Sequence, residues 1–493
     1  MKKILALTLA VLMILSLASC GEKKAETPTE PAAQKSEYKL SDQVDEKSVV
    51  DGVMTLIDGK DPILKKSAAS WLDTCVLYEV NVRQFTEEGT FKAFEGHLER
   101  LKGMGINTLW FMPIHPISET GRKGTLGSYY AVSDYKAVNP EFGTIDDFKH
   151  LVDKAHEMGF KVLLDWVANH TGWDNSWLKE HEDWYVRDES GKVVSPFDWT
   201  DVAKLNYDNY DMRAEMIRCM QYWVEDVGID GYRCDHAIGV PNNFWNAAVY
   251  KLKSINSEIM MLAENSENIG LTEYAFDSCY NDGFYSHADT ILGGVAVSSI
   301  KDAMAGSTQY AAGSFPMNYL DNHDKNSYEG SIVYRLENAY PALLALSYMA
   351  PGIPLIYTSD ETAYDHELEF FEKDTVKWDD EPVYAPLITA LSKLKTENKA
   401  LASTSADITF HEPDNSKLFA CSRSADDSAV YFIGSLSKEA MTGVTVDCGF
   451  EEATVVMHHD GAKLDTTETK MTKADFEKKD YKPFEFYILV AEK

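Results

Sequence analysis

Four short stretches of the chain place charged and hydrogen-bonding side chains directly after runs of apolar residues. The stretches are DWVANH (165–170), GYRCDHA (231–237), LAEN (262–265) and LDNHD (320–324). Charged side chains rarely follow a buried strand unless they are paired or used in chemistry. Carboxylates that meet at one place can act as a nucleophile and as a general acid or base. The four stretches can act together only if the fold brings them to one place.

Between about residue 75 and residue 361 the chain alternates short apolar runs with amphipathic segments. Predicted strands occupy 76–85, 106–114, 160–170, 229–237, 258–266, 275–280, 315–324 and 352–361. Predicted helices occupy 90–105, 144–159, 212–228, 242–255 and 335–350. Apolar strands separated by helices are typical of a parallel sheet that is covered on both faces. Eight such units predict an α/β fold, a (β/α)8 TIM barrel.

The four stretches follow the third, fourth, fifth and seventh predicted strands. In a barrel of this kind the groups that carry chemistry come from the C-terminal ends of the strands. The sequence therefore predicts that one face of the barrel gathers seven side chains: Asp165, His170, Arg233, Asp235, Glu264, His323 and Asp324. A salt bridge at the barrel mouth explains any one of them, but it does not explain all seven at the ends of apolar runs.

The four stretches, in this order, resemble the four motifs of glycoside hydrolase family 13, the α-amylase family. YYAVSDY (129–135) resembles the tyrosine-containing loop that follows the second strand in that family, and the resemblance covers roughly residues 75–490. It implies a retaining glycosidase whose nucleophile and acid are about 5–5.5 Å apart. By this resemblance Asp235 is the nucleophile, Glu264 is the general acid and base, and Asp324 is a third carboxylate that stabilises the transition state.

The resemblance also implies roles for the neighbours of these carboxylates. Arg233 is expected to hold the nucleophile ionised and oriented, with Asp165 balancing its charge. His170 and His323 are expected to hydrogen-bond hydroxyls of the sugar at the cleavage point, and Tyr130 is expected to stack beneath that ring. The general acid must stay protonated near neutral pH, which requires desolvation or nearby negative charge.

Many members of the family bind a structural calcium between the barrel and an insertion after the third strand. Asn169 matches one of the usual ligands. Lys204, in VAKLN, stands in the place of an aspartate ligand, and Gly239 stands in the place of a histidine. A cation in place of an anion opposes Ca²⁺ binding on charge grounds. We therefore expect no calcium and no other cofactor.

Composition changes along the chain predict its domains. We assign the catalytic barrel to residues 41–400, including a small insertion at about 171–210 that is longer than an ordinary connection. The insertion contains four tryptophans that we expect to serve packing more often than sugar binding: Trp173, Trp177, Trp184 and Trp199. From 401 to 493 the pattern changes to short alternating strands, which predicts an all-β C-terminal domain of sandwich type.

The N-terminal segment has the pattern of a bacterial lipoprotein signal. MKK supplies a positive start, an apolar run follows, and LASC (17–20) resembles a lipobox. We expect residues 1–19 to be removed, Cys20 to carry a lipid, and residues 20–40 to form a disordered tether. This predicts a protein outside the cytoplasm that is anchored to a bacterial membrane. An ordinary signal peptide with a chance cysteine is the alternative.

The net charge of the chain limits the kinds of molecule that it can bind. The formal net charge is −32, which argues against a nucleic-acid partner because phosphates require Lys and Arg. A neutral sugar is compatible with such a surface.

None of the six cysteines after Cys20 has the spacing of a metal or redox site, and several lie in apolar runs. We expect buried free thiols rather than disulfides.

The favoured function is therefore cleavage of α-glucosidic bonds in starch-derived oligosaccharides. A second interpretation uses the same covalent intermediate but transfers it to a sugar, as a glucanotransferase or an isomerase does. The motifs do not separate these two, because only the acceptor differs. A third interpretation is a non-catalytic glucan-binding protein, and the intact set of three carboxylates argues against it.

Overall fold

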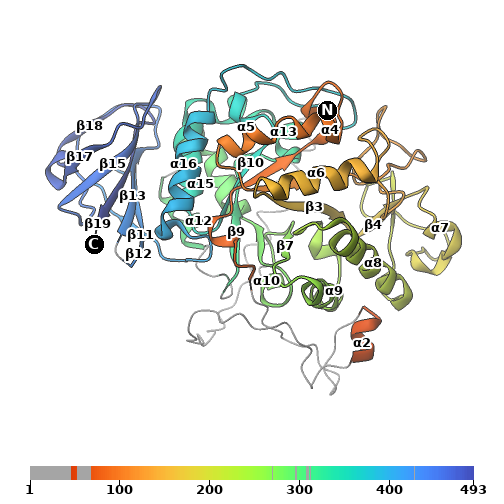
Figure 1. Ribbon diagram of the computed structural model, residues 1–493. Coiled ribbons are helices and arrows are strands. Elements are labelled where there is room, and N and C mark those ends of the chain that lie inside the picture. The colour runs from red at the N-terminus through yellow and green to blue at the C-terminus, as the bar shows by residue number, and fades with distance from the viewer. Residues whose placement is uncertain are drawn as a thin grey trace. The chain divides into compact units, whose positions relative to one another are not determined.

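Eight parallel strands close into a barrel in the computed structural model of the chain (Figure 1). The structure describes residues 46–52, 68–268, 270–294, 297–306, 310, 313–426 and 428–492. The expected signal segment (1–19) and tether (20–40) lie outside the described residues. None of the helices in these ranges has the length and apolar content that crossing a membrane requires.

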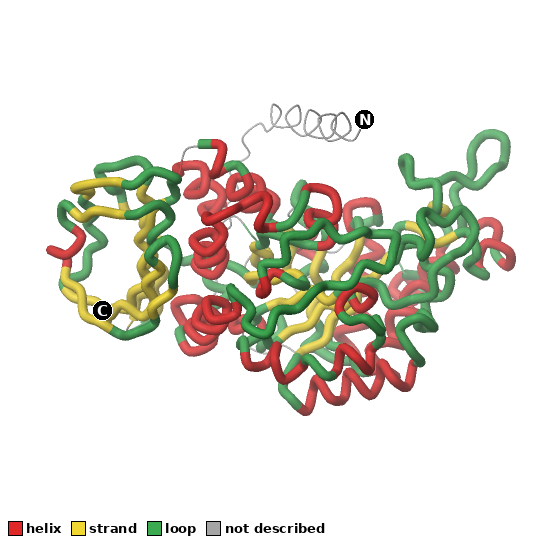
Figure 2. The backbone as a smooth tube through the Cα atoms, turned by 90° about the horizontal axis from the view of Figure 1, so that it is seen from above, coloured by secondary structure: helices red, strands yellow, loops and turns green. Residues whose placement is uncertain are grey.

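The barrel strands run in the order β1-β10-β9-β8-β7-β6-β3-β2. Their bounds are β1 Leu77–Val80, β2 Thr108–Phe111, β3 Lys161–Val167, β6 Gly231–Asp235, β7 Met260–Ala263, β8 Ser278–Tyr280, β9 Phe315–Asn318 and β10 Ile353–Tyr357. All eight fall within the predicted runs, and the predicted (β/α)8 barrel is confirmed. Helices lie outside the strands when the molecule is viewed from above (Figure 2).

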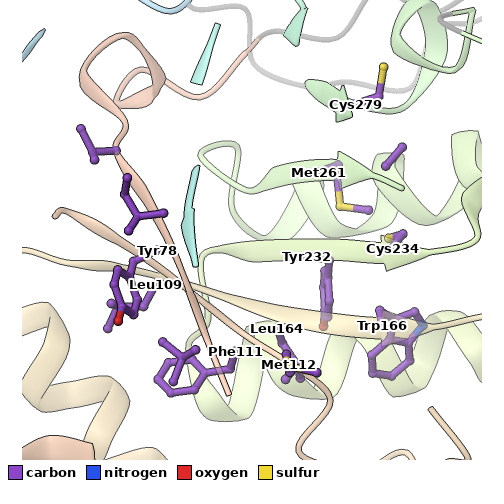
Figure 3. Close-up of a cluster of buried hydrophobic side chains, with 14 of the residues drawn as sticks. Tyr78, Leu109, Phe111, Met112, Leu164, Trp166, Tyr232, Cys234, Met261 and Cys279 are labelled. Carbon is purple, nitrogen blue, oxygen red and sulfur yellow. The ribbon is translucent and has the colours of Figure 1, made fainter. Parts of the chain in front are cut away.

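Side chains of the strands alternate between two hydrophobic cores, as the period of a strand requires. One core fills the barrel interior and includes Leu77, Trp110 and Leu163. The other lies between the strands and the helices and includes Tyr78 and Leu109 (Figure 3). Because both faces of each strand are buried, the strand residues are mostly apolar, and the buried charged side chains among them, such as Glu79, Asp165 and Arg233, require charged or hydrogen-bonding partners.

The helices outside the barrel include α6 (Ile145–Glu157), α8 (Tyr210–Tyr222), α9 (Asn242–Ile255) and α15 (Tyr340–Met349). The expected N-cap of α6 is confirmed, because the Thr144 hydroxyl accepts from the backbone N–H of Asp147 in a capping box. A π-helical turn, Trp223–Val227, extends α8. The predicted helix 90–105 is two helices, α4 (Phe91–Glu95) and α5 (Leu98–Gly103), with Gly96 and His97 between them.

Two predicted strands end earlier than expected, and a helix capped by an asparagine follows each of them. The Asn81 side chain accepts from the backbone N–H of Gln84, which ends β1 and begins α3 (Val82–Phe85). Asn322 caps α13 (His323–Glu329) in the same way after β9. Each cap lies within two residues of a group of the candidate site, Asn81 beside Glu79 and Asn322 beside His323.

The segment after β3 folds back as a small antiparallel pair. β4 (His170–Gly172) pairs with β5 (Val202–Lys204), and α7 (Trp177–Glu180) lies between them in sequence. Among the four tryptophans of this insertion, Trp184 is buried and the other three are half-buried. The pairing places Lys204 opposite His170, beside the end of β3.

The C-terminal part of the chain is built from strands. Seven of them form one sheet: β11 Thr409–His411, β12 Leu418–Ala425, β13 Ser428–Ser435, β15 Glu452–His459, β16 Leu464–Asp465, β17 Thr469–Thr472 and β19 Phe486–Glu492. A second pair, β14 (Met441–Val444) and β18 (Lys479–Tyr481), packs through a separate hydrophobic cluster. The buried guanidinium of Arg423 donates to the carbonyl oxygens of Met349 and Ser405, which joins this part to α15.

The six cysteines after Cys20 are free and buried: Cys75, Cys219, Cys234, Cys279, Cys421 and Cys448. The prediction of buried thiols is confirmed. Burial raises the pKa of five of these thiols, those of Cys75, Cys219, Cys234, Cys421 and Cys448. They are therefore apolar packing groups rather than nucleophiles.

Candidate active site

A buried arginine joins the ends of four barrel strands. Arg233, in the middle of β6, has no exposed surface. Its Nη1 donates to Asp165 Oδ1 at 3.0 Å and to Asp235 Oδ1 at 3.2 Å. Its Nη2 forms an ion pair with Glu264 Oε1 at 3.0 Å, and its Nε donates to the Tyr280 hydroxyl at 3.1 Å. One guanidinium therefore links groups from β3, β6, β7 and β8.

The register of the sheet brings these groups together. β3 and β6 pair so that Asp165 lies opposite Arg233 and Val167 lies opposite Asp235. The backbone N–H of Glu264 donates to the carbonyl of Cys234, so the residue after β7 lies beside the end of β6. Gly231, at the start of β6, is required by packing, because a Cβ there would lie 2.2 Å from the Met260 carbonyl oxygen.

The three candidate catalytic carboxylates lie at increasing exposure. The Asp235 side chain is 13% exposed, Glu264 29% and Asp324 43%. A cavity of about 250 Å³ opens onto Glu264 and Asp324, and Asn265 and Tyr319 contribute to its lining. A substrate can therefore reach the two outer carboxylates from solvent, while Asp235 stands deeper beside Arg233.

Asp235 and Glu264 differ in their ionisation. Burial, together with the charge of Glu264, raises the pKa of Asp235 well above its usual range. Glu264 is also desolvated, but the ion pair with Arg233 and a hydrogen bond from the backbone N–H of His236, at 2.6 Å, lower its pKa. The sequence interpretation had Arg233 keeping Asp235 ionised. Arg233 does lower the pKa of both carboxyl groups, but at Asp235 burial and the charge of Glu264 outweigh it.

His323 is a second positively charged group of the candidate site, besides Arg233. His323 Nδ1 lies 2.5 Å from Glu79 Oε1, and its Nε2 lies 2.9 Å from the Tyr130 hydroxyl and 3.5 Å from Asp324 Oδ2. Burial opposes a charge on this imidazole, but Asp324 and Glu79 raise the pKa of His323 to about 9. The ring is therefore an imidazolium at neutral pH, held between two carboxylates.

Tyr130 lies between the two charged groups. Its hydroxyl donates to Asp165 Oδ2 at 3.1 Å, and its ring stacks near those of His323, at 5.5 Å, and Phe370, at 6.3 Å between centroids. Burial raises the pKa of this phenol well above its ordinary value. The ring is thus held by two neighbouring protein rings, which also lie 6.2 Å from each other, in the place where a sugar-stacking surface was expected.

The insertion after β3 contributes aromatic and imidazole side chains to the candidate site. His170 is buried, and burial together with the charge of His236 lowers its pKa to about 3, so that it is a neutral imidazole. The half-buried Trp199 ring lies 5.5 Å from both His170 and His236. Phe197 lies 5.4 Å from His236, is 73% exposed, and has a φ of 51°, a conformation that non-glycine residues seldom adopt. One of the four tryptophans therefore lies beside the site, with an exposed phenylalanine.

The structure brings all eight predicted site residues to one end of the barrel, at the strand ends and the loops that follow them. Their neighbours include three groups that the sequence analysis did not select: Glu79, Tyr280 and Phe370. Glu79 is an acidic residue in an apolar run, like the residues that were selected. It was not selected because the predicted strand extends to residue 85, five residues past the observed end of β1. Tyr280 ends β8. Phe370 lies in a loop after β10, and no local pattern singled it out.

The residues at the expected calcium position do not fit a metal ion. Among the described residues, no group of three or more His, Cys, Asp or Glu side chains is arranged to hold one. The charge of Lys204, with burial as the larger cause, lowers the pKa of His236. A Cβ on Gly239 would lie 2.4 Å from the His236 ring and 2.8 Å from Asn169 Oδ1, so the space beside the Asn169 amide is already filled.

Known proteins resemble this chain in sequence and in fold. A family model described as "Alpha amylase, catalytic domain" matches residues 64–203 and 182–400. The chain is 28% identical to alpha-amylase MalA of Haloarcula japonica over 396 residues, covering 75% of this chain and 56% of that protein. It is 30% identical over 220 residues to an alpha-1,4-glucan:maltose-1-phosphate maltosyltransferase of Mycobacterium tuberculosis, covering 39% of this chain and 31% of that one.

Solved structures of alpha-amylases are also similar to this chain. An alpha-amylase of Lactobacillus plantarum superposes with a TM-score of 0.74 and 29% identity, covering 85% of this chain and 99% of that chain. The maltogenic alpha-amylase AmyB of Thermotoga neapolitana superposes with a TM-score of 0.73 and 28% identity, covering 86% and 99%. The chain spans only about half of the first sequence relative, so the activity of that whole protein does not transfer directly.

Replacing Glu79 should move the alkaline limit of activity. Glu79→Gln removes one of the two negative charges that raise the pKa of His323 from its ordinary value to about 9. The imidazolium is the form present below that pKa, so kcat/KM on maltoheptaose should begin to fall at a lower pH in the variant. An NMR titration of His323 should shift in the same direction.

Glu79→Asp keeps the charge and serves as the matched control, with a profile close to that of the wild type. An alkaline limb and an imidazole titration that both stay in place in Glu79→Gln would contradict this account of His323.

Calcium removal should leave the protein unchanged. A ligand present at 100 times its dissociation constant stabilises the folded state by about 2.7 kcal/mol. Because Lys204 opposes a divalent cation, the melting temperature should be equal in excess Ca²⁺ and in excess chelator. A melting temperature that rises with Ca²⁺ concentration in the wild type would show that a calcium site forms despite Lys204.

Proposed function

The chain belongs to the α-amylase family, and from that premise we propose that it is a retaining α-glucan hydrolase that acts on starch-derived oligosaccharides. The observation that carries the proposal is the buried Arg233, which contacts both Asp235 and Glu264 at the C-terminal end of the barrel. Retention requires a nucleophile and an acid that face one sugar ring, and these two carboxylates are placed together by neighbouring strands.

In the proposed first step, a carboxylate oxygen of Asp235 attacks the anomeric carbon of the sugar. The bond to the glycosidic oxygen breaks as Glu264 gives its proton to that oxygen, and the leaving sugar departs with a free hydroxyl. The product is an ester between Asp235 and the glycosyl group. In the second step Glu264, now ionised, takes a proton from water, whose oxygen attacks the same carbon and releases Asp235.

The proposed mechanism requires the proton of the pair to move. In the unliganded protein the ion pair with Arg233 lowers the pKa of Glu264, and burial raises that of Asp235. We propose that a glycosidic oxygen entering beside Glu264 separates this carboxylate from Arg233 Nη2. The guanidinium is then left to Asp165 and Asp235, and the proton passes to Glu264.

The surrounding residues fit contacts with a bound sugar. Asp324 is the most exposed of the three carboxylates and can accept from sugar hydroxyls. The charged His323 can donate, while the neutral His170 can donate or accept. Tyr130 presents its ring beside these groups. A sugar between them meets carboxylates and an imidazolium, which together stabilise the positive charge of an oxocarbenium-like transition state.

Transfer of the glycosyl group to a second sugar is the alternative, and an aromatic surface beside Glu264 is compatible with it. Phe197 and Trp199 stand beside His236, whose backbone N–H holds Glu264. Such a surface can receive either the leaving sugar or an acceptor sugar. The similarity to a protein named a maltosyltransferase is consistent with that use.

The proposed function is tested by a time course with maltoheptaose, with products separated by chromatography. The wild type should release shorter products, and Asp235→Asn should lose about 10³-fold or more of kcat because the nucleophile is removed. Asp134→Asn, a change of the same type on the surface, should keep the wild-type rate. Longer products would support transfer, and equal inertness of wild type and Asp235→Asn on maltoheptaose and pullulan would contradict both enzymatic proposals.

We also propose that Cys20 is lipidated and holds the enzyme on the outer side of a bacterial membrane. The support is the sequence of residues 1–40. In bacterial cells fed labelled palmitate, the full chain should take up the label and Cys20→Ala should not, whereas Cys448→Ala should be labelled like the wild type. Label that persists in Cys20→Ala, or is absent from the wild type, would contradict the anchor.

A further inference from the structure

A cavity larger than the one at Glu264 and Asp324 lies apart from the candidate active site. It has a volume of about 780 Å³ and lies between residues 86–88, after β1 and α3, and residues 364–378, after β10. The described residues that line it are all different from those that line the cavity at Glu264 and Asp324. Both segments are loops of the catalytic end, so the two cavities open at the same end of the barrel.

A fixed aromatic ring forms part of this second cavity. Trp378 is half-buried, and its Nε1 donates to the Phe85 carbonyl at 2.7 Å. The Arg100 guanidinium lies 4.5 Å from the centre of the indole ring, and it is held in turn by the fully buried Glu361 at 2.7 Å. The indole is therefore held in place before any ligand binds, which lowers the entropy cost of binding.

Polar groups stand around this ring. His366 Nε2 lies 2.7 Å from Asp374 Oδ2, and the Tyr364 ring lies 5.2 Å from that of His366. Asp374 Oδ2 also accepts from the backbone N–H of Glu369 at 2.9 Å. His366, with a side chain 41% exposed, and the half-buried Tyr364 therefore combine an apolar face with hydrogen-bonding groups within one cavity.

The charges of the cavity favour a neutral ligand over an ion of either sign, because the exposed Lys377 shares the lining with the exposed Glu87 and Glu88. The Lys373 ammonium is turned to the carbonyl oxygens of Arg83 and Thr86, at 2.8 and 3.1 Å, and so does not offer its charge to an anion. Burial lowers the pKa of His97, which is neutral at pH 7. Glu87 and Glu88 are exposed at the edge and repel anions. The described lining residues also do not form a group that could hold a metal ion.

We propose that this cavity is a second carbohydrate-binding site, with Trp378 and Tyr364 as stacking surfaces and His366 and Asp374 as hydrogen-bonding groups. An aromatic ring beside paired polar groups matches a sugar ring, which has an apolar face and hydroxyls at its edge. The choice of an α-glucan among neutral carbohydrates rests on the proposed function.

The loop after β10 is a shared wall of the two sites. One part of it, Phe370, stacks on the Tyr130 ring of the active site with an interplanar angle of 11°. The flanking residues of the same loop, Tyr364 and Trp378, face the second cavity. A glucan held in this cavity therefore lies on the same end of the barrel as the carboxylates and raises the local concentration of chain near them.

The test is a calorimetric titration of maltoheptaose into the full chain carrying Asp235→Asn, so that the ligand is not consumed. This protein should bind two molecules per chain. Adding Trp378→Ala or Tyr364→Ala should reduce the number to one, whereas adding Tyr334→Ala, an exposed tyrosine outside both cavities, should leave two. The Tyr364→Ala change removes fewer packing contacts and so keeps the test valid if Trp378→Ala unfolds.

Each outcome decides the inference separately from the catalytic proposal. One bound molecule in Asp235→Asn that is lost on Tyr364→Ala supports the second site and counts against glucan binding at the carboxylates. One molecule that survives Tyr364→Ala and Trp378→Ala, two that survive both changes, or no binding at all overturns the second site.

Discussion

The guanidinium of Arg233 is the group on which the rest of this site depends. A charge without solvent contact is costly unless ionised partners surround it, and removal of one partner from a buried pair typically costs about 3–5 kcal/mol. Arg233 finds its partners at the ends of β3, β6 and β7, in Asp165, Asp235 and Glu264. The strand register that closes the barrel is thus the same register that pairs this charge, so folding and the formation of the site are one event.

The charges around Arg233 do not balance, and this imbalance is useful chemically. Asp165, Asp235 and Glu264 share a single guanidinium, while His323 serves both Glu79 and Asp324. Five carboxyl groups face two cations in a largely desolvated space. Such an excess keeps a proton on one carboxyl group and favours a substrate that becomes positively charged in its transition state. A sugar passing through an oxocarbenium-like state meets that description.

Local sequence patterns were sufficient for the barrel and for most of the site, because both depend on where apolar runs stop. Asp165, Arg233 and Glu264 all follow this rule. Glu79 was missed because the alternation of its run continues past Val80, although the Asn81 cap ends the strand there. Phe370 and Phe197 lie in loops whose course is set by tertiary packing. The preference of Arg233 Nη2 for Glu264 depends on side-chain geometry that no spacing in the sequence encodes.

The most direct measurement is the site of covalent attachment of a slow substrate. The wild type would be incubated with 5-fluoro-α-glucosyl fluoride, digested, and analysed by mass spectrometry. We expect one added glycosyl group on the peptide that contains Asp235, and none in Asp235→Asn. A glycosyl group on the peptide containing Glu264 or Asp324, or steady turnover of the reagent by Asp235→Asn, would contradict the assignment of Asp235 as the nucleophile held by Arg233.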